Sequence, residues 1–156
     1  ADELALYWHL LGIYMGSEAL PGAIERMLIG KTQGESMLAA ARTAELFPRL
    51  ASPEAVPSEI AALLDAMPRI ALLAAWAYAC EPAVLRRLRQ YMGVWSKVRP
   101  SHNGNDLQAL GIARGPCIGR LLQRLRAVRL DGEVNSREAE LALIRQLVGA
   151  GFCDEA

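Results

Sequence analysis

Apolar residues recur along most of this chain at the three- and four-residue spacing of amphipathic helices. In residues 116–129, one face of a helical wheel carries Ile118, Leu121, Leu122, Leu125 and Val128. Similar spacing occurs in residues 4–15, 82–97 and 137–148, and no stretch alternates apolar and polar residues over four or more positions. The pattern therefore predicts an all-α fold of about eight or nine short helices, without a sheet.

Glycine and proline residues indicate where several of these helices begin and end. Gly111 stands where a helix C-terminus favours positive φ, and Pro116 stands at a first helical position, which needs no amide hydrogen. Asp131 and Gly132 should end the helix that Pro116 begins. Gly119 lies one turn inside that helix, where glycine costs about 1 kcal/mol relative to alanine. We interpret this cost as a sign that another backbone packs closely against Gly119.

Residues 1–156 are expected to form one helical domain, since a chain of this length buries roughly two-thirds of its unfolded surface. Within it we distinguish a helical body, residues 1–80, from a basic C-terminal tail, residues 81–156. The longest apolar run, residues 70–80, is too short to span a bilayer, so no membrane association is expected.

The cysteines indicate a reducing environment. Cys80, Cys117 and Cys153 show no C-x-x-C spacing and are odd in number. Reduced thiols in a cytoplasmic protein are the simplest interpretation. Asp2 and Glu3 stand where a secretory leader would be basic, which agrees with a cytoplasmic location.

Charge is distributed unevenly, although the chain is neutral overall. Residues 1–80 contain five basic and nine acidic residues, whereas residues 81–156 contain twelve basic and eight acidic residues. Between Arg86 and Arg129 there are ten basic residues and one acid, Asp106, a net charge of +9. A helical hairpin with a merely solvated basic face would show a similar pattern. The density of the block nevertheless indicates a polyanionic partner.

A motif in residues 103–140 carries a family resemblance. It reads G-x-D-L-x-x-L-G-x-x-x-G-P-x-I-G-x-x-L, followed by L-D-G-E-V and S-R-E-x-E. This stretch resembles the C-terminal helical region of bacterial tRNA nucleotidyltransferases, the CCA- or A-adding enzymes of the poly(A) polymerase superfamily. Residues 89–100 also resemble the helix that leads into the motif in longer members of the family. The motif residues that we single out are Gly104, Asp106, Gly111, Gly115, Pro116, Gly119, Asp131 and Gly132.

The resemblance implies a longer enzyme whose head domain adds nucleotides to the tRNA 3′ end, using Mg²⁺ with ATP or CTP. A first residue other than methionine, Ala1, agrees with a fragment of such a protein. The helical region would bind the acceptor and TΨC arms of tRNA, and the other domains of the parent chain would be further partners. Cations on consecutive helices would contact phosphates without reading sequence. The predicted RNA-binding residues are Arg86, Lys97, Arg99, Arg114, Arg120 and Arg124.

The carboxylate pair that nucleotidyl transfer requires is missing from the sequence. In the family, an acidic pair on a strand of the head domain holds Mg²⁺. Glu138 and Glu140 have the spacing of such a pair, but they fall in the first turn of a predicted helix. We therefore expect no catalytic residue, metal site or cofactor in this chain, and no activity of the chain alone.

Two other functions remain open. The chain could be a helical protein-interaction or homo-oligomerisation module whose basic face binds an acidic partner. It could also be the equivalent region of a poly(A) polymerase, because the choice of nucleotide belongs to the head domain.

Overall fold

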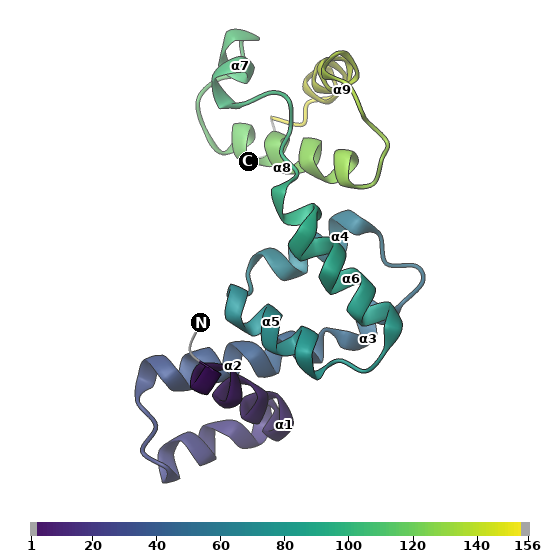
Figure 1. Cartoon of the computed structure of the whole chain (residues 1–156). Coiled ribbons are helices and arrows are strands. Elements are labelled where there is room, and N and C mark those ends of the chain that lie inside the picture. Colours follow the sequence, from purple (N-terminus) through teal and green to yellow (C-terminus); the bar gives the residue numbers. More distant parts are fainter. Residues whose placement is uncertain (1–2, 154–156) are drawn as a thin grey trace. The chain divides into compact units, whose positions relative to one another are not determined.

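The computed structural model describes residues 3–153, and within that range its regular structure is entirely helical (Figure 1). Nine α-helices and one 3-10 helix follow one another in these residues, with no strand among them. The all-α prediction is therefore confirmed. The elements are α1 (Glu3–Arg26), α2 (Lys31–Glu45), α3 (Phe47–Ala51), α4 (Pro57–Asp65), α5 (Arg69–Tyr78), α6 (Pro82–Gly93), η1 (Trp95–Lys97), α7 (Gly104–Ala109), α8 (Pro116–Leu130) and α9 (Arg137–Gly149).

The chain divides into two compact units. Unit 1 comprises residues 3–55 and 59–96 of the described chain, and unit 2 comprises residues 56–58 and 97–153. We expected one domain whose basic tail begins at residue 81, whereas the main part of the second unit begins at residue 97. The boundary lies later because α6 packs against α3 and α5 and so belongs to unit 1.

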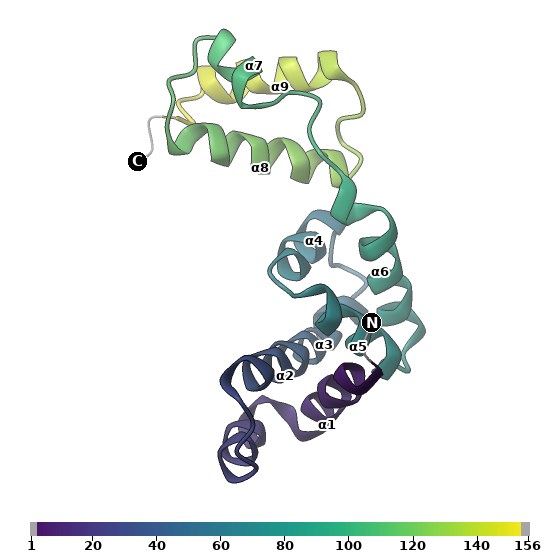
Figure 2. The same ribbon diagram turned by 60° about the vertical axis from the view of Figure 1, so that its left-hand side comes forward.

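Unit 1 begins with α1 and α2, which pack against each other (Figure 2). Gly16 interrupts α1 with φ 74° and ψ 160°, a conformation that glycine adopts without a steric penalty. Leu20 of α1 and Met37 of α2 are fully buried between the two helices. Tyr7 and Tyr14 also belong to the apolar pattern of α1, but both are exposed. The contact between α1 and α2 therefore uses only part of that pattern.

Helices α3, α5 and α6, together with residues 59–65 of α4, complete unit 1. The Tyr91 hydroxyl of α6 donates a hydrogen bond to Asp65 at 2.9 Å, and Arg87 donates one to the carbonyl oxygen of Ala55 at 2.8 Å. Within residues 3–153, no single helix is long and apolar enough to cross a membrane. Helices α4 and α5 together have the length and composition of a membrane-spanning segment, but the chain bends by 119° between them.

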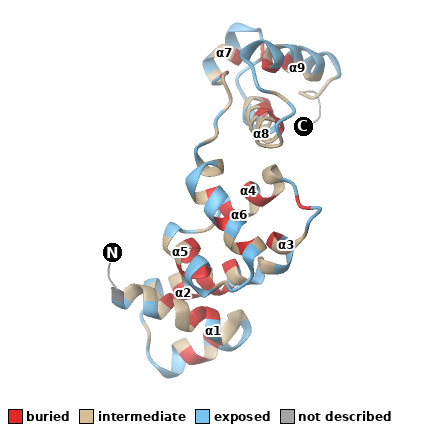
Figure 3. Ribbon diagram, turned by 45° about the vertical axis from the view of Figure 1, so that its right-hand side comes forward, coloured by how far each residue is buried: buried red, intermediate tan, exposed pale blue. Residues whose placement is uncertain are grey.

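Unit 2 is built around α8, with α7 and α9 packed on it. Its core contains Leu121 and Leu125 of α8, Leu107 of α7 and Ile144 of α9, and Figure 3 shows buried residues in red. The apolar face predicted for residues 116–129 is thus confirmed as the core-facing side of α8.

The ends of the helices in unit 2 follow the motif residues. Gly104 is the first residue of α7, which is capped by reciprocal hydrogen bonds between Asn103 and Asp106. Asp131, at the end of α8, accepts a hydrogen bond from the backbone N–H of Ser58 at 2.9 Å. Gly132 follows with φ 79°. The predicted end of the helix that starts at Pro116 is therefore confirmed.

Candidate nucleic-acid interface

The candidate interface begins at the turn between α7 and α8. Gly111 follows α7 with φ 88°, as predicted, and Gly115 is an extended residue before Pro116, the first residue of α8. No side chain caps this end of α8. The partial positive charge of a helix N-terminus is therefore not neutralised by a capping group of the protein.

An exposed stripe continues from this uncapped end along α8. Gly115, Gly119, Gln123 and Arg124 are exposed, and Arg120 beside them is half-buried. We call these five residues, together with the exposed Arg114 directly before them, the α8 stripe. A Cβ atom added to Gly115 or Gly119 would meet no heavy atom within 4 Å. The stripe thus presents bare backbone next to arginine side chains.

The position of Gly119 contradicts one prediction. We expected a close contact with another backbone there, but Gly119 is exposed and the space where its side chain would stand is open. The prediction is wrong because the core of unit 2 packs on the other face of α8, around Leu121 and Leu125. The structure therefore gives this glycine no packing role.

Gly119→Ala is accordingly expected to raise the free energy of unfolding by about 1 kcal/mol, through helix propensity alone. Urea unfolding of the variant and the wild-type chain, monitored by circular dichroism, measures this change. Gly111→Ala serves as the control, because alanine at φ 88° is strained even though no heavy atom lies nearby. Destabilisation by Gly119→Ala would show that the site is not open.

The six cations predicted to bind RNA belong to both units. Arg86 is exposed on α6 in unit 1, and the other five belong to unit 2. Lys97, Arg99, Arg114 and Arg124 are exposed, as a phosphate-binding role requires. Arg114 and Arg124 form no hydrogen bond or ion pair with any other residue of the described chain. These two side chains can therefore take an external anion without breaking a contact within residues 3–153.

Arg120, the sixth of these cations, is half-buried, whereas a phosphate-binding residue is expected to be exposed. Its Nη2 donates a hydrogen bond to the carbonyl oxygen of Phe152 at 3.4 Å, and its guanidinium carbon lies 5.9 Å from the centroid of the Phe152 ring. Its Nε atom is buried and has no hydrogen-bond partner among the described residues. The helical wheel placed Arg120 opposite the apolar face, but it contained no information about Phe152, which follows α9.

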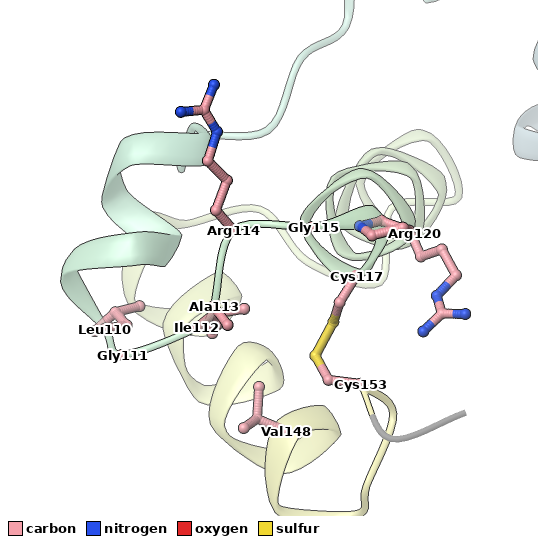
Figure 4. A pocket seen from close by; sticks show the side chains of 11 residues that line it. Leu110, Gly111, Ile112, Ala113, Arg114, Gly115, Cys117, Arg120, Val148 and Cys153 are labelled. Carbon is pink, nitrogen blue, oxygen red and sulfur yellow. A yellow bond between two sulfur atoms is a disulfide. The ribbon is translucent and has the colours of Figure 1, made fainter. Parts of the chain in front are cut away.

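A surface pocket of about 590 Å³ lies beside the start of α8 (Figure 4). Leu110, Ile112 and Val148 form apolar parts of its lining, and Arg114 and Arg120 also line it. In Figure 4 the Arg114 side chain extends away from the apolar residues. The pocket thus brings together two of the predicted RNA-binding residues.

Two of the cysteines are bonded to each other. Cys117 and Cys153 form a disulfide with their Cα atoms 5.2 Å apart, and Cys80 is free and exposed. The expectation of reduced thiols is therefore wrong for this pair. A separation of 36 residues carries no motif, and the bond forms because the residues after α9 return to the first turn of α8.

A buried carboxylate that no sequence motif marks joins the segment before α7 to α8 and α9. Glu140 accepts hydrogen bonds from the backbone N–H groups of Ser101 at 2.8 Å and His102 at 3.2 Å, from His102 Nδ1 at 3.1 Å, and from Arg129 at 2.6 Å. Burial raises the pKa of Glu140, but the hydrogen bonds from these three residues outweigh it, so the pKa lies below its usual value. Glu140 is thus an ionised structural residue.

The Glu138–Glu140 pair does not fit a magnesium site. Glu138 is exposed, whereas Glu140 is fully buried and its carboxylate oxygens already accept the hydrogen bonds described above. Nowhere in residues 3–153 do three or more His, Cys, Asp or Glu side chains form a group that could hold a metal ion. The Glu140 carboxylate is thus engaged in structural hydrogen bonds and does not face Glu138 across a shared site.

No protein-family model, curated protein or solved structure matches this chain. The motif residues do adopt the predicted backbone conformations, with positive φ at Gly111 and Gly132 and a helix start at Pro116. Such features occur at the ends of many helices. They bear out the local structure, and the family remains a hypothesis that binding experiments can test.

Proposed function

We propose that this chain is the C-terminal, tRNA-binding region of a cytoplasmic tRNA nucleotidyltransferase, and that the α8 stripe of unit 2 binds tRNA phosphates. The proposal is supported chiefly by one observation: Arg114, beside the uncapped start of α8, and Arg124, farther along the same helix, are exposed and make no internal polar contact within the described chain. Nucleotide addition, with Mg²⁺ and ATP or CTP, is assigned to a head domain outside this chain.

Three properties of the α8 stripe favour a phosphate ligand. Arginine guanidinium groups match phosphate oxygens in planar, two-pronged geometry. A helix N-terminus attracts anions through its free N–H groups and dipole. Gly115 and Gly119 leave the backbone of α8 uncovered, so that a bulky sugar–phosphate chain can approach it closely. Each property alone is common, but here they coincide on one helix.

The same stripe favours recognition of RNA shape over recognition of base sequence. It contains arginine, glycine and glutamine, and it offers no aromatic side chain on which a base could stack. Contacts to phosphates fix the position of a nucleic acid without distinguishing its bases. An enzyme that acts on every tRNA needs recognition of this kind.

Replacing Arg114 and Arg124 by alanine, singly and together, is expected to weaken tRNA binding to a similar degree for different tRNAs. Each lost phosphate contact should lower the magnitude of the salt slope, d log K/d log[salt], by roughly 0.7–0.9. Fluorescence anisotropy with labelled tRNA at several salt concentrations gives both quantities. Arg42→Ala, which removes an exposed cation from α2 in unit 1, is the matched control and should leave the slope unchanged.

These replacements should hardly affect folding, because exposed charges without partners contribute little to stability. A folded double variant that binds tRNA with the wild-type slope would refute the assignment to the α8 stripe. Absence of tRNA binding by the wild-type chain at low salt would overturn the proposed function. Displacement of tRNA by polyglutamate at equal charge concentration would favour the protein-interaction alternative instead.

A further inference from the structure

The half-buried Arg120 lies within a row of groups suited to bind phosphate, yet its guanidinium is turned toward the protein. Its two contacts with Phe152 are both near the outer limit for such interactions, with a hydrogen bond of 3.4 Å and a ring distance of 5.9 Å. Its buried Nε lacks a partner in the described chain, which disfavours this arrangement further. Phe152 also packs, partly buried, against the apolar core of unit 2, so its position does not depend on Arg120.

The Cys117–Cys153 disulfide adds a covalent link between the segment that carries Phe152 and the first turn of α8. Cys117 precedes Arg120 by one turn of α8, and Cys153 directly follows Phe152. The end of α9 also positions Phe152. The backbone N–H of Phe152 donates a hydrogen bond to the carbonyl oxygen of Leu147 at 3.1 Å, and Gly151, with φ 79°, makes the turn that permits this bond. This hydrogen bond holds Phe152 at the end of α9, whereas the disulfide attaches residues 152–153 covalently to α8.

We propose that the Cys117–Cys153 disulfide is a redox-controlled latch that keeps Arg120 out of reach of an anionic ligand. When the bond is intact, Phe152 stays against α8 and Arg120 remains covered. When the bond is reduced, residues 152–153 separate from α8 and the Arg120 guanidinium turns into solvent beside Arg124. The role of the latch in RNA binding rests on the proposed function, for which it provides regulation.

The chemistry requires a thiol reductant, of the glutathione or dithiol class. A reductant thiolate attacks Sγ of Cys153, the more exposed residue of the pair, and the bond between the two cysteine sulfurs breaks. Cys117 leaves as a thiolate and takes up a proton. A second reductant thiol then displaces Cys153 as a free thiol, and the reductant ends as its own disulfide. Disulfides in cytoplasmic proteins are mostly transient or redox-sensing, which agrees with this use.

The first test measures the exposure of Arg120 without RNA. The chain with Cys80→Ser, which removes the free exposed thiol, is prepared oxidised and reduced with dithiothreitol, then treated with phenylglyoxal and analysed by peptide mass spectrometry. Reduction should raise the modification rate of Arg120 several-fold. Arg114, which is exposed in the structure, serves as the internal reference, and its modification rate should not change. An Arg120 rate that does not change on reduction overturns the latch, whatever the RNA measurements show.

The second test measures tRNA binding in the same two states. Reduction should steepen the salt slope by roughly 0.7–0.9, the value of one added phosphate contact. Arg120→Ala should abolish this difference, and Cys153→Ser should behave like the reduced chain in both conditions. Equal slopes in the two states, with Arg120 exposed only after reduction, would refute its phosphate contact. Exposure of Arg120 on reduction without tRNA binding in either state would support the latch and overturn the proposed function.

Discussion

Glu140→Ala is expected to lower the free energy of unfolding of unit 2 by about 3–5 kcal/mol, the cost of removing one partner from a buried ion pair. The Glu140 carboxylate is fully buried and accepts hydrogen bonds from two backbone N–H groups, from His102 and from Arg129. Alanine leaves the two backbone N–H groups and His102 without this acceptor, and Arg129 keeps its hydrogen bond to the Ser101 hydroxyl. The substitution also removes the hydrogen bonds that join residues 101–102 to α9.

The unfolding of unit 2 can be distinguished from that of unit 1 by comparing circular dichroism with tryptophan fluorescence. All three tryptophans, Trp8, Trp76 and Trp95, belong to unit 1, so tryptophan fluorescence follows the unfolding of that unit alone. The variant should lose helical circular dichroism at lower urea concentrations, while its fluorescence transition stays in place. Glu138→Gln, at an exposed carboxylate two residues earlier on α9, is the control and should change little. An unchanged circular dichroism transition in Glu140→Ala would contradict the role assigned to this carboxylate.

The pH dependence of this stabilisation has a definite sign. The pKa of Glu140 is lower in the folded chain than its ordinary value, so the ionised form stabilises the fold. The contribution is complete above the unfolded pKa of about 4.3 and is lost as pH falls through the folded value. Glu140→Gln should lack this part of the acid dependence and be less stable than wild type at neutral pH. If the free energies of unfolding of wild type and Glu140→Gln fall in parallel as the pH is lowered, the acid dependence belongs to other groups.

Glu140 shows what a sequence pattern can and cannot predict. On a helical wheel it shares the apolar face of α9 with Ile144, four residues later, so an acid on a core-facing position was visible in the sequence. Its donors were not visible. Three of them lie 38 or 39 residues away, and two of these are backbone N–H groups, which any residue other than proline can supply. The fourth donor, Arg129, lies 11 residues away on another helix.

The helix ends of unit 2 were predictable because their signals are local. Pro116 and Gly132 impose restrictions on backbone conformation that act within one or two residues, and the structure places them at the boundaries of α8. The coverage of Arg120 and the pairing of Cys117 with Cys153 were not predictable. Both depend on where the chain returns after α9, and this is set by tertiary packing.

The glycines inside helices also show that features set by tertiary packing are not predictable from local sequence. A glycine inside a helix indicates either a close approach of another element or nothing more than a tolerated loss of propensity, and the sequence alone does not distinguish these cases. We predicted a close approach at Gly119, where the structure leaves open space. The close approach occurs instead in unit 1, at Gly12 of α1, next to Met37 of α2.

Gly12→Ala is therefore expected to destabilise unit 1 by about 1–3 kcal/mol, although alanine is the better helix former. The added Cβ would lie 2.7 Å from the backbone oxygen of Met37 and 3.1 Å from its Cβ. These atoms belong to the main chain of α2 or are attached directly to it, so they move only if the whole helix shifts. Such a shift would open the contact at Leu20, which is fully buried between α1 and α2.

Gly22→Ala, in the part of α1 that follows the break at Gly16, is the matched control. Its Cβ would meet only the guanidinium of Arg26, at 3.5 Å, an ordinary contact with the end of a flexible side chain. This variant should gain up to about 1 kcal/mol from helix propensity. Urea unfolding followed by tryptophan fluorescence compares the two variants in unit 1. The two substitutions make the same chemical change in one helix, so the difference between their free energies isolates the contact with Met37. If both variants are stabilised equally, α1 and α2 do not approach each other at Gly12 as closely as the structure shows.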